Sequence, residues 1–256
     1  MSVPRPPHQA PGRGAVLTLL RHGQSEWNRL GRFTGWTDID LSAAGIREAQ
    51  RAAGLLARDE IRFDVVVTSV LKRTIRSAWI VEDELDAMWV PVLRDWRLNE
   101  RHYGALQGED KSETARRVGA EQVRCWRRDF RERPPALAPD DRRHPRFDRR
   151  YAGLSPDQLP CAESLEDTMA RVMRCWSDTV SPRLCAGQNV LIVAHGNSLR
   201  ALVKHLLGIS DDDVATLEIP TAEPWVFTLD QRARVVSDRR LTGETTEDRR
   251  PPGDEH

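Results

Sequence analysis

Short apolar runs recur along the chain and predict the strands of a buried sheet. The first run, residues 15–20, ends directly in Arg21-His22-Gly23, and the clearest run, residues 189–194, ends in His195-Gly196-Asn197. Three further runs have the length and composition of strands: residues 64–68, a shorter run at 90–93, and a last run at 224–229 that we place at the edge of the sheet.

Apolar residues with helical spacing occupy much of the chain between these runs. Over residues 42–57, Ser42 is a suitable N-cap, and Ile46, Ala49, Ala53 and Leu56 fall on one face. The same spacing or composition predicts helices at 71–85, 111–131, 164–184 and 199–207. Strands that alternate with helices indicate an α/β domain with a mostly parallel sheet.

The chain divides into a single domain, residues 15–230, with a polar segment at each end. The proline-rich arm, residues 1–14, and the polar tail, residues 231–256, are predicted to be disordered or mobile. Residues 132–160 are rich in proline and lack periodicity, which predicts a long excursion over the surface of the domain.

The composition argues against several classes of function. Lys+Arg and Asp+Glu both number 39, so the net charge is zero. A chain without excess positive charge is not expected to bind nucleic acid, and any anion site must be a local pocket. No apolar run approaches the roughly 20 residues of a membrane span, and the N-terminus lacks the apolar core of a signal peptide. The four cysteines fit neither a zinc spacing nor a disulfide framework, which predicts reduced thiols in a cytoplasmic enzyme.

Two histidines follow predicted strands, and each is itself followed by glycine: His22 and His195. Ligands of open parallel sheets bind beyond the carboxyl ends of the strands, so both histidines should share one crevice. A metal site would need carboxylates beside them, whereas Arg21 stands there and attracts phosphate instead. No P-loop pattern is present. A lone histidine after a strand is more often a capped or solvated residue than a catalyst, and it is the neighbouring residues that favour catalysis here.

Phosphoryl transfer through a histidine fits this pattern best. A neutral imidazole at His22 is a competent nucleophile, and Arg21, Arg73 and His195 would supply positive charge around the transferring oxygens without a metal. A carboxylate must also move the proton of the reacting hydroxyl, and Glu100 is the candidate. The alternative for Glu100 is a salt-bridged turn residue.

Long segments that occur in a fixed order carry a resemblance to a known family. They are RHGQSEWN at 21–28, FTGW at 33–36, TSVLKR at 68–73, WRLNERHYGALQG at 96–108, WRR at 126–128, ESL at 163–165 and AHGNSLRALV at 194–203. From about residue 17 to about residue 230, the chain resembles the cofactor-dependent phosphoglycerate mutases of the histidine phosphatase superfamily. The resemblance implies a mostly parallel central sheet with one antiparallel edge strand and helices on both faces.

The resemblance also implies roles for individual residues. His22 matches the residue that becomes phosphohistidine, Glu100 the proton donor and acceptor, and Arg21, Arg73 and His195 the clamp on the phosphoryl group. Positions that match phosphate or ligand contacts are Asn28, Thr34, Gly35, Arg101, Tyr103, Lys111, Arg127, Arg128, Gly196 and Asn197. Lys111 is the more telling match, because only three of the 39 basic residues are lysines.

By the same resemblance, the enzyme interconverts 3-phosphoglycerate and 2-phosphoglycerate in glycolysis and gluconeogenesis. 2,3-Bisphosphoglycerate is the implied primer and intermediate, and no metal is required. Small phosphorylated acids are the implied partners, and the family resemblance implies a homodimer or homotetramer, for which Trp79, Trp89 and residues 90–93 offer contact material.

A few residues depart from the family pattern. Ala222 replaces the usual glycine after Ile-Pro-Thr and would be strained if that position has a positive φ. Glu218 stands where asparagine is expected, Ala162 where threonine is expected, and Glu109-Asp110 adds acid beside Lys111. The departures bear on efficiency and on leakage to water rather than on the chemistry of His22.

Three alternatives remain open on the sequence. A phosphomonoester hydrolase of the same superfamily would share the two histidines and Arg73, but would not need the segment from Glu100 to Lys111 or residues 126–128. A bias toward bisphosphoglycerate synthase or phosphatase activity is a smaller variant. A catalytically silent scaffold would be expected to lack His22 or His195, and both are present.

Overall fold

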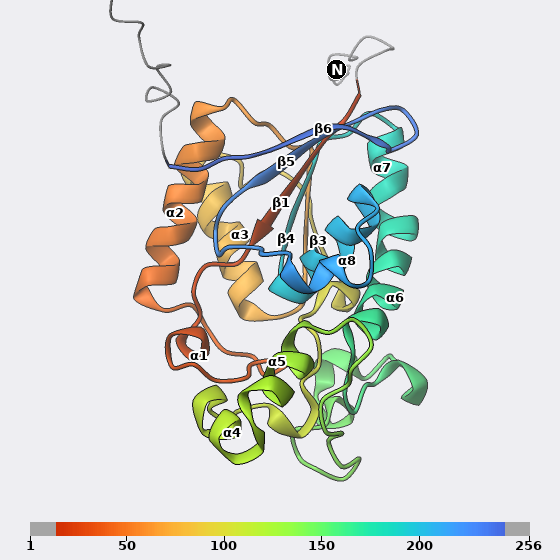
Figure 1. Ribbon diagram of the computed structural model, residues 1–256. Helices are drawn as coiled ribbons and strands as arrows, with labels where there is room; N and C mark the ends of the chain where they lie inside the picture. Colours follow the sequence, from red (N-terminus) through yellow and green to blue (C-terminus); the bar gives the residue numbers. More distant parts are fainter. Residues whose placement is uncertain (1–13, 244–256) are drawn as a thin grey trace, which may run out of the picture.

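One six-stranded sheet forms the centre of the molecule (Figure 1). The computed structural model describes residues 14–243. The sheet order is β3-β2-β4-β1-β5-β6. The strands are β1 Val16–Arg21, β2 Val65–Thr68, β3 Val92–Arg94, β4 Val190–Ala194, β5 Trp225–Leu229 and β6 Val235–Arg240. The four strands from β3 to β1 are mutually parallel, whereas β5 runs antiparallel to β1 and β6 antiparallel to β5.

The predicted fold class is confirmed, with one difference at the edge of the sheet. The strand predicted at 224–229 is antiparallel, but it is not the edge, because β6 pairs along it. The register of the central pair sets Leu20 beside Val193 and Arg21 beside Ala194. His22 and His195 are the next residues of these two strands, so the sheet itself places them side by side.

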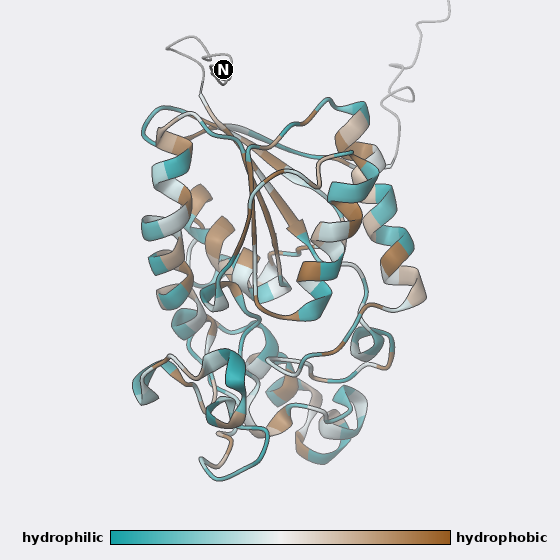
Figure 2. Ribbon diagram, turned by 180° about the vertical axis from the view of Figure 1, so that it is seen from behind, coloured by the Kyte–Doolittle hydropathy of each residue, from teal (hydrophilic) through white to brown (hydrophobic). Residues whose placement is uncertain are grey.

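Helices cover both faces of the sheet, as the burial pattern requires. The long helices are α2 Ala43–Arg58, α3 Lys72–Glu84, α6 Leu165–Cys175 and α8 Gly196–Leu207, and the shorter ones are α1 Glu26–Arg29, α4 Lys111–Val118, α5 Ala120–Arg128 and α7 Ser181–Cys185. Leu20 and Val193 pack toward α2 and α3, whereas Leu19 and Ile192 pack toward α6 and α8. Figure 2 shows mostly hydrophobic strands between helices that carry both hydrophobic and hydrophilic residues.

Local capping explains where α2 begins. The Ser42 hydroxyl accepts a hydrogen bond from the Gly45 N–H at 3.1 Å, which satisfies one of the free donors of the first turn. Ala49, Ala53 and Leu56 then lie on the buried face of the helix, as predicted.

Two predicted helices are interrupted. Residues 111–131 form α4 and α5 rather than one helix, because Gly119 between them adopts a φ of 96°. Residues 164–184 form α6, a π-helical turn over Trp176–Val180, and α7, whose first turn contains Pro182. A proline lacks the N–H that a continuous helix would need at that point.

The tail prediction was wrong for residues 231–243. β6 is ordered there because it hydrogen-bonds along β5, Leu241 is buried, and the Trp225 indole N–H donates to Asp238 at 2.8 Å. Sheet pairing supplies the order that the polar composition lacks. The rest of the predicted tail, residues 244–256, and residues 1–13 of the predicted N-terminal arm lie outside the described residues.

The predicted excursion, residues 132–160, contains short turns and buried side chains, and we call it the cap. It contains short 3-10 turns at Pro145–Phe147, Arg149–Tyr151 and Pro156–Gln158. Leu137, His144 and Tyr151 are buried, and the Asn99 amide donates to the Tyr151 hydroxyl at 2.9 Å. Figure 1 shows this segment in green, with α4 and α5, beyond the carboxyl ends of the parallel strands. None of the helices within residues 14–243 is long and apolar enough to cross a bilayer.

Glu82 on α3 is a buried acid that carries a pH-dependent cost. Its side chain is 1% exposed, and its Oε1 has no hydrogen-bond partner among the described residues. Burial raises the pKa of Glu82 to about 7, with the charge of Arg94 opposing the shift. Because the folded pKa lies above the ordinary value, ionisation favours unfolding, and stability is lost as the pH rises toward and through 7.

Glu82→Gln should therefore raise the free energy of unfolding by about 1–2 kcal/mol at pH 8, and by less at pH 5. Urea denaturation at the two pH values measures the difference. Asp83→Asn, at an exposed position on the same helix, is the matched control and should show no such pH-dependent gain. An equal gain for Glu82→Gln at both pH values would contradict the assignment.

Candidate active site

His22 lies at the carboxyl end of β1 and is 2% exposed. Its Nδ1 lies 2.6 Å from the Gly23 carbonyl oxygen, so Nδ1 carries the proton and donates it, which leaves Nε2 with a free lone pair. Burial, and then the charges of Arg73 and Arg21, lower the pKa of His22 well below its ordinary value. The imidazole is therefore neutral, as a nucleophile must be.

Gly23 makes this geometry possible. A Cβ added at Gly23 would lie 2.1 Å from the Gly45 carbonyl oxygen, a contact no side chain tolerates. The close approach of these two glycines seats the turn after β1 against the first turn of α2.

His195 follows β4 and caps α8, with its ring centroid 5.0 Å from that of His22 and the planes at 67°. Its Nδ1 accepts from Arg73 Nε at 3.2 Å, and its Nε2–H donates to the Ser69 hydroxyl at 2.8 Å. Burial first, and then the charge of Arg73, lower the pKa of His195 well below its ordinary value. The two histidines thus lie side by side, as predicted, but His195 is fully buried and does not line the pocket.

Arg73 is the structural centre of the cationic group. Its side chain is 1% exposed, and its two terminal nitrogens donate to the carbonyls of Gly35 at 2.8 Å and Thr37 at 2.9 Å. Burial lowers the pKa of Arg73 to about 10, so the guanidinium remains charged at neutral pH. Arg73 therefore fixes both the His195 ring and the loop that carries Thr34 and Gly35.

Glu100 is the one predicted site carboxylate, and it is 9% exposed. Its Oε1 accepts from the backbone N–H groups of Arg101 at 2.9 Å and Asn197 at 3.1 Å. Burial alone raises the pKa of Glu100, but these hydrogen bonds and the charges of Arg21 and Arg73 outweigh burial, and the net pKa lies below the ordinary value. The group is an ionised base in the ligand-free pocket.

A single pocket collects most of the predicted residues. Its wall includes Arg21, His22, Asn28, Thr34, Gly35, Arg73, Glu100, Tyr103, Lys111, Arg127, Arg128, Gly196 and Asn197. The other two predicted residues lie behind the wall. His195 lies against the ring of His22, and Arg101 is fully buried behind Tyr103, whose hydroxyl accepts from its Nη2 at 3.2 Å.

The pocket also contains residues that the motifs did not single out as ligand contacts. Arg32, Phe33, Arg200, Glu218 and Ile219 line it. Ser69, which holds His195, lies outside the lining. Helical spacing could have found Arg200, because it stands three residues after Asn197 on α8 and donates to the Asn197 side chain at 3.0 Å.

Unpaired donors identify the chemistry that the pocket accepts. Among the described residues, buried side-chain donors without a partner include Arg21 Nε, Thr34 Oγ1 and Arg128 Nη1 on the pocket wall, and Arg101 Nε and Nη1 behind it. Buried donors that lack a partner are costly, so a site that gathers them fits an anionic ligand with several acceptor oxygens. The N-terminus of α8, at Gly196 and Asn197, adds backbone donors to the same wall. No group of three or more potential metal ligands occurs within residues 14–243.

Two of the departures from the family pattern have clear structural consequences. Glu218 forms an ion pair with Arg128 at 2.6 Å, so a protein carboxylate is already bound to one of the arginines predicted to bind ligand. Ala222 has a φ of 50°, the left-handed conformation anticipated for that position, and its N–H donates to the Arg21 carbonyl at 2.9 Å. The strained residue is therefore tied directly to the end of β1.

Comparison with known proteins agrees with this geometry. The model of the histidine phosphatase superfamily (branch 1) matches residues 17–140 and 138–241. The solved structure of Bacillus stearothermophilus YhfR matches with a TM-score of 0.65 at 21% identity, over 87% of this chain and 95% of that one. A mycobacterial glucosyl-3-phosphoglycerate phosphatase matches with a TM-score of 0.62 at 24% identity, over 84% and 92%. Likenesses at this identity show the fold alone.

Curated relatives found by sequence share a much higher identity with this chain than these solved structures do. A 2,3-bisphosphoglycerate-dependent phosphoglycerate mutase of Nitrosococcus oceani is 56% identical over 218 residues, which cover 85% of this chain and 91% of the relative. One of Nitratidesulfovibrio vulgaris is 56% identical over 227 residues, covering 89% and 91%. The chain therefore belongs to the histidine phosphatase superfamily. Within that superfamily it belongs to the 2,3-bisphosphoglycerate-dependent phosphoglycerate mutases, which confirms the resemblance seen in the motifs.

Ala222→Gly should raise the free energy of unfolding by about 1 kcal/mol, because a left-handed backbone costs a non-glycine residue about 1–2 kcal/mol and the extra freedom of unfolded glycine cancels part of the gain. Urea denaturation measures the change. Ala57→Gly, at an exposed position within α2, should instead lose about 1 kcal/mol. Equal destabilisation by both substitutions would show that position 222 is not strained.

Proposed function

We propose that this chain interconverts 3-phosphoglycerate and 2-phosphoglycerate by carrying a phosphoryl group on His22. The neutral imidazole, with Nδ1–H held by Gly23 and Nε2 free beside a cationic pocket, is the observation that carries the proposal. The unpaired donors around it and the names of the two bacterial relatives support the same substrate class.

The proposed step begins with attack by His22 Nε2 on phosphorus. A P–N bond forms as the P–O bond of the donor breaks, and the equatorial oxygens are stabilised by Arg21, Arg73 and the donors at the start of α8. His195 is proposed to stabilise the same transition state from the end of β4, where its ring centroid lies 5.0 Å from that of His22. The charge that a metal supplies in other phosphoryl transferases is supplied here by arginines.

Glu100 is proposed to move the proton. When a hydroxyl attacks phosphohistidine, its proton passes to the Glu100 carboxylate, and in the reverse step the leaving oxygen takes that proton back. Anionic phosphates of a bound ligand raise the pKa of a neighbouring carboxyl, so Glu100 can hold the proton between the two transfers. The carboxylate and the free Nε2 thus have complementary tasks.

The rest of the ligand is proposed to lie against the second group of cations. Lys111 is held over the Phe33 ring at 5.9 Å, and burial lowers its pKa, which makes an anion a favourable partner. Arg127 and Arg128 line the same wall at the end of α5. Residues proposed to complete this contact are Asn28, Thr34, Gly35, Arg101, Tyr103, Gly196 and Asn197.

2,3-Bisphosphoglycerate is proposed as the primer and intermediate, since the pocket offers charge at both ends of such a ligand. A plain phosphomonoester hydrolase remains the second candidate, because it needs only the His22 half of the pocket. The paired arginines of α5 and Lys111 favour the mutase, whereas the Glu218–Arg128 pair weakens one of these contacts and favours some leakage to water.

The decisive assay follows 3-phosphoglycerate conversion with and without added 2,3-bisphosphoglycerate, beside release of free phosphate. Primer-dependent isomerisation is expected to exceed phosphate release by at least about tenfold, because the hydroxyl of the bound substrate is positioned to accept the phosphoryl group and water is not. Phosphate release as the main reaction would favour the hydrolase.

His22→Ala should abolish turnover and remove the phosphate adduct that mass spectrometry is expected to find on residue 22 of the primed enzyme. His205→Ala, an exposed histidine on α8, is the matched control and should retain both. Turnover by the His22 variant would remove this residue from its role.

We also propose a homodimer, or a tetramer built from it, in the cytoplasm. Trp79, Met88 and Trp89 are 47%, 57% and 80% exposed. Trp79 lies on α3, and Met88 and Trp89 lie just before β3, the edge strand of the described sheet. Large exposed aromatic residues beside an unpaired strand edge fit the same surface of a second copy. The four cysteines are free thiols, which suits a reducing compartment.

Sedimentation velocity should find the wild-type chain larger than a monomer, and Trp89→Arg should shift it toward the monomer, because an exposed charge would be buried against a copy of itself. Phe147→Arg, which removes an exposed aromatic residue from the distant cap, should leave the assembly unchanged. A monomeric wild-type chain would contradict the proposal.

A further inference from the structure

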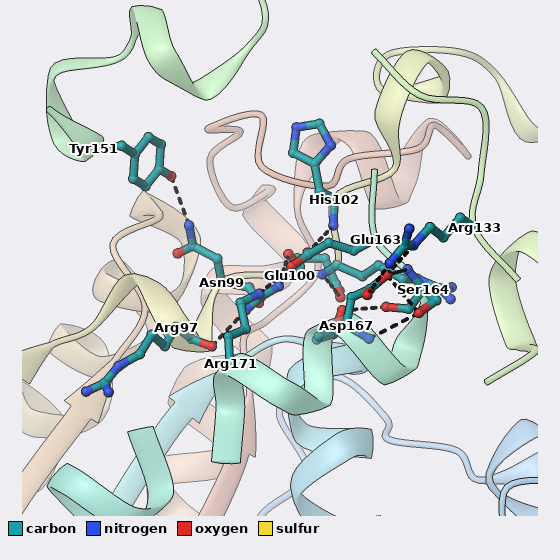
Figure 3. Close-up of polar contacts among 12 residues, drawn as sticks. Arg97, Asn99, Glu100, His102, Arg133, Tyr151, Glu163, Ser164, Asp167 and Arg171 are labelled. Carbon is teal, nitrogen blue, oxygen red and sulfur yellow. Dashed lines mark hydrogen bonds and ion pairs between the residues drawn. The ribbon is translucent and has the colours of Figure 1, made fainter. Parts of the chain in front are cut away.

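Arg171 hydrogen-bonds to the backbone around Glu100 from outside the pocket. It lies on α6, and one of its terminal nitrogens donates to the carbonyls of Arg97 at 2.7 Å and Asn99 at 2.8 Å. The other terminal nitrogen donates to the Glu100 carbonyl at 2.9 Å. Figure 3 shows the guanidinium reaching from α6 to this segment. One planar side chain thereby fixes three carbonyls of the short stretch that ends in the site carboxylate.

Glu163 pairs with the same guanidinium and also hydrogen-bonds to the backbone of His102, just after Glu100. Its oxygens accept from Arg171 Nε at 2.6 Å and Nη2 at 2.8 Å, and Oε2 also accepts from the His102 N–H at 2.8 Å. The Glu163 N–H donates to the His102 carbonyl at 2.9 Å. The two side chains are only 8% and 6% exposed. Residues on both sides of Glu100 are therefore held by one buried ion pair.

The start of α6 places both partners. Ser164 caps the helix, with its hydroxyl accepting from the Asp167 N–H at 3.1 Å, so Glu163 stands just before the first turn. Arg171 follows two turns later, on the face that meets residues 97–100. The first turn of α6 also carries Asp167, which pairs with Arg133 at 2.6 Å. Arg133 is 64% exposed, and the hydrogen bonds of its guanidinium go to Asp167.

Stability alone does not account for this arrangement. Burying two charges costs several kcal/mol per ion before pairing, and apolar residues of similar volume are often as stable in such places. Catalysis, in contrast, depends steeply on placement, since a displacement of about 1 Å can lower a rate by about 10²-fold. Neither Arg171 nor Glu163 lines the pocket, so both act through the segment that they hold.

We propose that Arg171 and Glu163 are positioning residues that hold the Glu100 carboxylate at the hydroxyl involved in phosphoryl transfer. The inference rests on the proposed function of His22 and Glu100. It assigns the ion pair to proton transfer rather than to formation of the P–N bond. Loss of the pair should therefore slow only those reactions in which a proton must move.

Two half-reactions separate these effects. In labelling by acetyl phosphate, His22 Nε2 takes the phosphoryl group and acetate leaves without needing a proton. In discharge to 3-phosphoglycerate, the substrate hydroxyl attacks phosphohistidine, a P–O bond replaces the P–N bond, and the hydroxyl proton must pass to Glu100. Intact-mass spectrometry after rapid quenching follows both half-reactions on the same sample.

Arg171→Gln should be labelled by acetyl phosphate within about twofold of the wild-type rate but discharge to 3-phosphoglycerate about 10²-fold more slowly, the usual size of a lost acid–base contribution. Arg133→Gln, which breaks the exposed pair with Asp167 of α6, should match wild type in both. Normal discharge by Arg171→Gln, or equal slowing of both half-reactions, would overturn the inference.

The remaining variants keep the test interpretable if one charge left alone destabilises the fold. The double variant Glu163→Gln/Arg171→Gln removes both charges, and Arg171→Lys keeps the charge but cannot reach three carbonyls at once. Both should be labelled normally and discharge slowly, with Arg171→Lys intermediate. Absence of label on residue 22 of the wild-type enzyme would instead overturn the proposed function, and this inference with it.

Discussion

Parallel pairing of β1 with β4 is the constraint on which the rest of the site depends. The register that sets Arg21 beside Ala194 brings two histidines from opposite ends of the sequence to a ring separation of 5.0 Å. Hydrophobic burial on both faces of the sheet fixes that register, because a slip by one residue would move every core side chain to the wrong face. Packing energy spread over the whole core is thus what holds the reacting groups in place.

Much of this could be predicted from sequence because the relevant signals are local. Runs such as Val190–Ala194 are apolar over their whole length, and the residues that follow parallel strands must converge at one edge. The site residues lie in long motifs, and thirteen of the fifteen predicted ones line a single pocket. Catalytic geometry constrains residue identity tightly, so these motifs are conspicuous.

The missed features depend on tertiary context. β6 begins with two valines but is polar over Ser237–Arg240, and the hydrogen bonds that β5 offers it are not revealed by any local pattern. The break between α4 and α5 turns on the conformation of one glycine. Ser69 and Arg171 act on other protein groups rather than on ligand, and in a chain with so many arginines no local signal separates Arg171 from those at the surface. Sequence patterns therefore revealed the residues at the pocket wall more readily than those supporting them.

The hydrogen bond between His22 and Gly23, buried beside two arginines, has a physiological consequence. Free histidine gains a proton when its surroundings become mildly acidic. The lowered pKa of His22 keeps this ring neutral at such pH values. Mild acidification of the cell would therefore not protonate the nucleophile. The phosphate group of the substrate would instead be the part that responds to pH, because phosphate esters take up a proton near a pKa of about 6.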